Sequence, residues 1–226
     1  MNTPLFHHSL TDSKFWDLAL KEVLTAINTA LKKHPTARIG LSGGRTPKHL
    51  YELLAQEKLP WDKITFILLD ERYVPVTDPE SNLGMVQATL PEVKILAFDT
   101  TKPAHDAAEA MASELIHFTD QRQPLFDLLI LGAGKEGHIA SLFEEDTALA
   151  CNEYAFVAHA KGYPTESRLT TCLMALQSST QAILLLQGEE KRPVLEALKT
   201  GAGLKLTALH HLMEKMPLTV LTDLSA

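Results

Sequence analysis

The 226-residue chain has few of the residues and motifs that mark disulfide-rich or metal-binding proteins. Its two cysteines, Cys151 and Cys172, form no CxxC pair, and no Cys/His cluster surrounds them. There is no HExxH motif, and the paired histidines at 7–8 and 210–211 are adjacent residues, which cannot share one face of a helix. We therefore expect reduced thiols and no metal site.

Long apolar runs and an excess of basic residues are also missing. No uninterrupted apolar stretch reaches the length of a bilayer span, and residues 1–9 lack the basic segment and apolar core of a signal peptide. The net charge of −7 does not favour a nucleic-acid-binding surface. These features predict a cytoplasmic protein with neither membrane nor nucleic acid as a partner, as a monomer or weak homo-oligomer.

The chain alternates apolar strand patterns with amphipathic helix patterns, without repeats or a clear linker. This alternation and the length predict one α/β domain over residues 1–226, with a mostly parallel sheet between two layers of helices. The expected strands are 37–41, 64–69, 93–98, 126–131, 154–158, 182–186 and 218–221. The expected helices are 12–33, 49–56, 82–90, 104–119, 170–177, 192–199 and 207–215, with a loop at 161–168.

The chain is organised around residues 126–143, FDLLILGAGKEGHIASLF. An apolar strand leads into a turn with three glycines, and a helix is expected to begin at His138. Glu136 and His138 stand at the carboxyl end of that strand, where open α/β sheets bind ligands. Gly132 and Gly134 would let a ligand approach the main chain closely. The alternative is a tight structural turn with a histidine at the surface.

The same turn matches the dinucleotide fingerprint GxGxxG, which is weak without an acidic residue about 20 positions later. The next apolar stretch ends in His159-Ala160-Lys161 instead. The turn also lies past the middle of the chain, with a histidine where a pyrophosphate-binding helix would begin. We therefore reject a nicotinamide cofactor.

A second turn, Ser42-Gly43-Gly44-Arg45-Thr46, follows the first expected strand and leads into a helix. Glycines expose backbone N–H groups, and a helix N-terminus offers unpaired donors and a partial positive charge. The turn is therefore a candidate anion site, although it is not a Walker A loop. An ordinary capped turn is the alternative.

Charged residues follow other strands. Asp70 and Arg72 come directly after the strand at 64–69: the arginine can bind a carboxylate, phosphate or oxyanion, and Asp70 can orient a hydroxyl or a base. Asn82 opens the next helix, where it either caps the helix or binds a ligand. Arg168 and Lys191 follow in later loops, where basic residues are commonly only solvated.

Taken together, these motifs resemble the 6-phosphogluconolactonases, within a wider group that includes glucosamine-6-phosphate deaminase and ribose-5-phosphate isomerase. The matching blocks are LSGGRTP at 41–47, DERYVP at 70–75, DPESN at 78–82 and LGAGKEGHIASLF at 131–143. Weaker matches are SRLT at 167–170 and GEEK at 188–191. The chain departs from the family pattern at Glu136, usually Asp, at Ile139, usually Thr, and at Glu144, usually Pro. The family's late tryptophan is also missing, since only Trp16 and Trp61 are present.

The resemblance implies a Rossmann-like, three-layer α/β fold similar to that of glucosamine-6-phosphate deaminase, with no metal or organic cofactor. It implies hydrolysis of a small phosphosugar lactone, 6-phosphoglucono-1,5-lactone, in the oxidative pentose phosphate pathway. His138 would be the general base and then the general acid, with Glu136 holding it or a sugar hydroxyl. Arg72 or glycine-turn amides would stabilise the oxyanion. The phosphate would lie on the turn at 42–46, with Arg168 and Lys191.

Two other functions stay open at this point. One is an amino-sugar phosphate deaminase or isomerase, which Ile139 favours slightly, although Ser141-Leu142-Phe143 departs from the Phe-Asn-Glu-Pro continuation of the deaminases. The other is a sugar-phosphate-binding protein without catalytic activity. It would need a DNA-binding or partner domain, and the sequence shows neither a helix-turn-helix nor a basic surplus.

Overall fold

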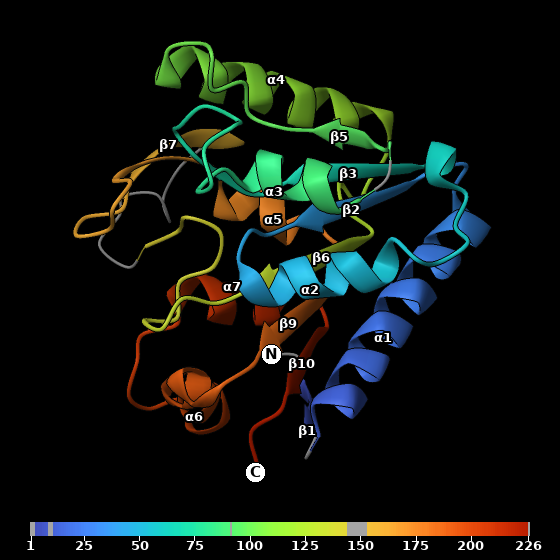
Figure 1. The fold of residues 1–226 in the computed structure, drawn as a ribbon, viewed down its shortest axis with the longest axis vertical. Coiled ribbons are helices and arrows are strands. Elements are labelled where there is room, and N and C mark those ends of the chain that lie inside the picture. The colour runs from blue at the N-terminus through green and yellow to red at the C-terminus, as the bar shows by residue number, and fades with distance from the viewer. Residues whose placement is uncertain (1–2, 9–10, 91, 144–152, 226) are drawn as a thin grey trace.

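A computed structural model describes residues 3–8, 11–90, 92–143 and 153–225. Within these residues, seven strands form one sheet in which every pairing is parallel (Figure 1). In spatial order the strands are β1 (Leu5–His8), β10 (Leu218–Thr222), β9 (Ala182–Leu186), β6 (Leu128–Gly132), β2 (Ala37–Leu41), β3 (Ile64–Leu68) and β5 (Lys94–Leu96). This arrangement confirms the predicted parallel α/β sheet and adds β1, which the sequence patterns did not reveal. The strand predicted at 154–158 does not belong to it and lies in a separate sheet.

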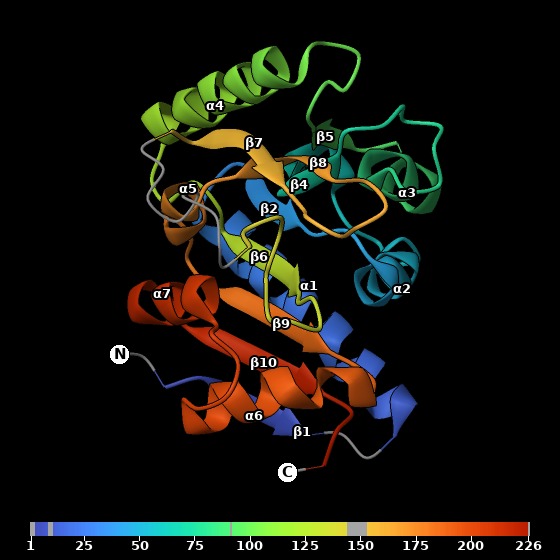
Figure 2. The same ribbon diagram turned by 90° about the vertical axis from the view of Figure 1, so that its left-hand side faces the viewer.

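Helices pack on both faces of this sheet, as predicted (Figures 1 and 2). One face carries a core built with α1 (Asp12–Lys33), α2 (Arg45–Leu54) and α3 (Asn82–Thr89). The other carries a core built with α4 (Ala104–Gln121), α5 (Leu173–Gln177), α6 (Arg192–Thr200) and α7 (Thr207–Lys215). Short 3-10 turns lie at Trp61–Lys63 and Glu189–Lys191.

The central strands are apolar on both sides because each face meets a separate core. Along β6, Leu128 and Ile130 enter the core of α1 and α2, while Leu129 and Leu131 enter the other core. In β2 the second face carries Arg38 at the start of the strand and then Gly40. A Cβ at that residue would lie 2.7 Å from Cδ2 of Leu129, so the small residue lets neighbouring strands pack closely.

A second, three-stranded antiparallel sheet was not predicted. It contains β4 (Asp70–Arg72), β8 (Ser167–Thr171) and β7 (Ala155–His159), in that order. The sequence predicted a loop at 161–168 followed by a helix at 170–177. This prediction is wrong where the two meet, because residues 167–171 form β8. The chain pairs with β4 through Thr170 and with β7 through Thr171, and α5 begins only after Cys172, whose side chain accepts a bond from the N–H of Ala175.

The helix predicted to begin at His138 is also wrong. The N–H of Gly134 donates to the carbonyl of His138, and that of Leu142 donates to the carbonyl of Ile139. Ala140 has a φ of 48°, a left-handed value that a right-handed helix does not contain. Burial of Ile139 and Leu142 holds this folded turn in place. Glu144 and Cys151 lie outside the described residues.

Other element boundaries shift by a few residues. The second helix begins at Arg45 rather than at residue 49, directly after the glycine turn. Among the described residues, no helix combines the length and apolar composition that crossing a membrane requires.

A buried ion-pair cluster ties the amino-terminal ends of β2 and β6 together. The carboxylate of Asp127 accepts the backbone N–H of Arg38 at 2.8 Å and two bonds from Arg122 at 2.5 and 3.1 Å. The Asp127 side chain is only 5% exposed. Losing this carboxylate would leave both a backbone donor and a largely buried guanidinium without their partner.

We expect Asp127→Ala to lower the free energy of unfolding by about 3 kcal/mol, because it breaks a buried pair by removing one partner. Chemical denaturation measures this change. Asp17→Ala, at an exposed position of α1, is the matched control and should change stability by no more than about 0.5 kcal/mol. Equal stability of the two variants would contradict the role given to the cluster.

Candidate active site

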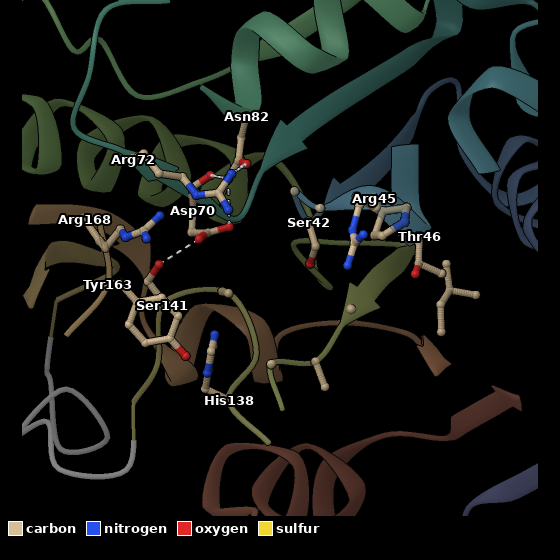
Figure 3. A pocket seen from close by; sticks show the side chains of 18 of the residues that line it. Ser42, Arg45, Thr46, Asp70, Arg72, Asn82, His138, Ser141, Tyr163 and Arg168 are labelled. Carbon is tan, nitrogen blue, oxygen red and sulfur yellow. Dashed lines mark hydrogen bonds between the residues drawn. The ribbon is translucent and has the colours of Figure 1, made fainter. Parts of the chain in front are cut away.

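A pocket opens at the carboxyl ends of β2 and β6, beside β4 and β8 (Figure 3). It gathers nearly all of the residues that the sequence nominated, from six separate stretches of chain: Ser42, Gly43, Gly44, Arg45, Thr46, Asp70, Arg72, Asn82, Gly132, Gly134, His138, Arg168 and Lys191. Glu136 is the exception, since it does not line the pocket and instead lies behind His138.

The turn after β2 brings the open N-terminus of α2 to the pocket. Gly44 precedes the helix with a φ of 108°, and no side chain caps the first turn. The backbone N–H groups of that turn therefore remain available to a ligand. The buried hydroxyl of Tyr51 donates to the carbonyl of Ser42 at 2.8 Å and fixes the turn from behind.

Gly43 is required because Asn82 packs directly against it. A Cβ at position 43 would lie 1.8 Å from Oδ1 of Asn82. The Asn82 amide nitrogen donates to the carbonyl of Asp70 at 2.9 Å, and its Oδ1 accepts a hydrogen bond from Nη1 of Arg72. Asn82 is only 1% exposed, so it connects the glycine turn to β4 from inside the protein.

Two buried carboxylates hold this wall of the pocket. The carboxylate of Glu71 accepts the backbone N–H groups of Arg72, Asn82 and Leu83, each at 2.7 Å. Burial raises the pKa of Glu71, while these hydrogen bonds oppose the rise. Asp70 accepts the hydroxyl of Ser141 at 2.7 Å and thereby ties β4 to the turn that carries His138.

Arg72 and Arg168 stand opposite each other on the paired strands β4 and β8. Arg168 is 5% exposed, and burial together with the neighbouring Arg72 lowers its pKa. The Nε of each arginine is buried without a hydrogen-bond partner among the described residues. Two adjacent guanidiniums with unused donors favour an anion in this part of the pocket.

His138 points into the pocket, between the arginines and the turn before α2 (Figure 3). Its ring lies against Gly134, where a Cβ would come within 2.1 Å of Cε1, and packs on Phe143 with 4.4 Å between ring centroids. Burial lowers the pKa of His138, and the charges of Glu136 and Asp70 partly oppose this. The histidine is therefore held as a neutral base near pH 7.

The pocket also contains residues that the sequence did not nominate, among them Ser141, Phe143 and Tyr163. Ser141 and Phe143 fall within the block 131–143, but a helix there would have directed their side chains differently. Tyr163 belongs to a loop with no motif of its own. Its proximity depends on the β7–β8 hairpin, which the sequence patterns did not reveal.

Metal-ligating side chains come together at one place in the described part of the chain. His105, Asp106 and Glu109 lie exposed on α4, and none of them lines the pocket. The expected absence of a metal and of an organic cofactor stays a prediction.

Comparison with known proteins agrees with this architecture. Residues 11–213 match the family model described as Glucosamine-6-phosphate isomerases/6-phosphogluconolactonase. A 6-phosphogluconolactonase of Thermotoga maritima is 35% identical over 188 residues, covering 80% of this chain and 83% of the relative. A 6-phosphogluconolactonase of Synechocystis sp. is 37% identical over 189 residues, covering 78% and 77%.

Solved structures support the same grouping. The crystal structure of 6-phosphogluconolactonase from Thermotoga maritima matches with a TM-score of 0.84 and 28% identity, covering 97% of this chain and 99% of that one. The Trypanosoma brucei enzyme, at 21% identity and a TM-score of 0.83, shares the fold. With a family match across most of its length and relatives above 30% identity, this chain belongs to the glucosamine-6-phosphate isomerase/6-phosphogluconolactonase family.

Proposed function

We propose that this protein hydrolyses 6-phosphoglucono-1,5-lactone to 6-phosphogluconate, a step of the oxidative pentose phosphate pathway. One observation carries the proposal. A single pocket combines a largely buried histidine with an uncapped helix N-terminus and four basic side chains, those of Arg45, Arg72, Arg168 and Lys191. A phosphorylated lactone needs both parts, a base near its carbonyl carbon and a binding site for its phosphate.

His138 supplies the proton transfers of this mechanism. Its neutral ring removes a proton from water as the oxygen attacks C1 of the lactone, and it returns that proton to the ring oxygen as the C1–O bond breaks. The lowered pKa suits the first step, because the ring is unprotonated at neutral pH. Its packing between Gly134 and Phe143 limits its rotation and aims it at one place.

Arg72 is the donor that we assign to the developing oxyanion. Its guanidinium is held by the side chain of Asn82 and by the carbonyl of Glu80, at 3.0 Å from the latter, so it is fixed before substrate arrives. The N–H of Gly134 is already bonded to the carbonyl of His138 and is excluded from this role. This removes Gly134 from the earlier alternative of glycine-turn amides.

The phosphate is assigned to the N-terminus of α2, with Lys191 reaching the same pocket from the turn before α6. Arg168 remains a phosphate ligand in this proposal, although its strand partner Arg72 places it near the oxyanion as well. Binding energy from the phosphate, remote from the reacting carbon, orients the lactone against His138.

A coupled assay tests the proposal directly. Purified protein should remove 6-phosphogluconolactone faster than the lactone hydrolyses spontaneously, and should release no ammonia from glucosamine 6-phosphate. Ammonia release with no lactone hydrolysis would favour a deaminase. Phosphosugar binding without either reaction would favour a binding protein.

We expect His138→Asn to lower kcat by about 10²- to 10⁴-fold, the usual contribution of a positioned acid–base group. In the unmodified protein, kcat/KM should rise with pH through a limb below pH 6.5, because the histidine must be neutral and its pKa is lowered from that value. Stopped-flow measurement of lactone loss checks both. Near-normal turnover by a folded variant would remove His138 from this role.

Lys191→Ala should mainly raise KM, by about tenfold, because it removes one charge-assisted contact to a group that does not react. The matched control is Lys215→Ala, at an exposed position near the end of α7. Steady-state kinetics on both variants makes the comparison. A KM equal to that of the control would contradict contact between Lys191 and the phosphate.

A further inference from the structure

The loop between β7 and β8 places a tyrosine against the histidine turn. The N–H of Ala160 donates to the carbonyl of Glu166 at 2.8 Å and closes the base of this loop. Gly162, with a φ of 82°, turns the chain so that Tyr163 enters the pocket. The Tyr163 ring meets His138 edge-on, with 5.9 Å between centroids.

The Tyr163 hydroxyl has a specific partner. It donates to Oε2 of Glu136 at 2.8 Å, and the same oxygen lies 3.6 Å from Nδ1 of His138. That separation is too long for a hydrogen bond, so the carboxylate acts on the imidazole through its charge. Nδ1 is buried and has no hydrogen-bond partner among the described residues.

The Glu136 carboxylate is only weakly held beside His138 by its other charged neighbour. Its side chain is 50% exposed, and its other oxygen lies 3.7 Å from Nζ of Lys135, which is itself 76% exposed. An exposed pair of this kind is weak and leaves the carboxylate free to turn toward solvent. The hydrogen bond from Tyr163 is the contact that keeps Oε2 beside the histidine.

We propose that Tyr163 is a positioning residue for His138, acting through Glu136, which its hydroxyl holds beside the imidazole. This rests on the proposed role of His138 as the base. A carboxylate beside Nδ1 favours the tautomer with its proton on that nitrogen and so leaves Nε2 as the proton acceptor. It also makes the ring a stronger base, against the burial that weakens it. The Glu at position 136, where the family usually has Asp, gives the carboxylate an extra methylene with which to reach the loop.

Other charged groups around His138 are unaffected by this contact. Asp70 on β4 favours the protonated ring, whereas Arg168 on β8 and Lys191 before α6 oppose it. None of the three bonds to the Tyr163 hydroxyl, although Arg168 stacks over its ring at 6.0 Å. Tyr163→Phe keeps that ring and removes only the hydroxyl, which isolates the contact with Glu136.

The test compares Tyr163→Phe, Glu136→Gln and the double variant. Each single change should lower kcat by about tenfold, the loss expected for one hydrogen bond to a charged group, with KM changed less than about twofold. The acid limb of the pH profile should move to lower pH, because a ring that loses a neighbouring negative charge protonates less readily. The double variant should match Glu136→Gln alone, because both changes break one connection.

NMR titration of the His138 ring, assigned by comparison with His138→Asn, follows the same shift without turnover. It therefore decides the proposal even if the protein fails to hydrolyse the lactone. Tyr73→Phe is the matched control, since that hydroxyl donates to the carbonyl of Lys102 at 2.8 Å outside the pocket. An unshifted His138 titration in Tyr163→Phe, a shift equal to that of the control, or additive losses in the double variant would each overturn the proposal.

Discussion

The pocket depends on two adjacent carboxylates, those of Asp70 and Glu71, which point into the protein instead of into water. Glu71 binds the backbone of α3, and Asp70 binds the hydroxyl of Ser141, which lies 71 residues away along the chain. Buried charges are costly unless hydrogen bonds satisfy them, so each carboxylate forces its partners into place. Through these bonds β4, α3 and the turn carrying His138 form one rigid wall.

Glu71 also makes the N-termini of the neighbouring helices α2 and α3 differ in how many backbone N–H groups are free. At α3 the first backbone N–H groups are bound by Glu71, and the hydroxyl of Ser81 accepts another. At α2 no side chain takes this place, and Gly43 and Gly44 bring the backbone to the pocket surface. A dianionic ligand therefore meets unpaired donors at α2 and none at α3. This contrast, more than the glycines alone, is why we assign the anion to the N-terminus of α2.

The parallel sheet was predictable because its strands are short apolar runs separated by helical patterns, and most of the pocket followed because motifs at strand ends must converge. The turn at 138–143 was not predictable, since HIASLF has helical spacing. That spacing is overridden by the burial of Ile139 and Leu142, the contact of Ser141 with Asp70 and the left-handed Ala140. Tyr163 could not be found either. Its place depends on the pairing of β7 with β8, where the sequence pattern predicted a loop and a helix instead of a second strand.

The cations that suit this pocket to a phosphate also act on its base. Burial, Arg168 and Lys191 all lower the pKa of His138, while Glu136 and Asp70 raise it. With the cations alone, the ring would stay neutral but would be a weak base, poorly able to take a proton from water. With the carboxylates alone, its pKa would be higher, and less of the neutral base would be present near pH 7. A site that binds a phosphate through nearby basic residues therefore needs a counter-charge beside its histidine, and Asp70 and Glu136 provide it.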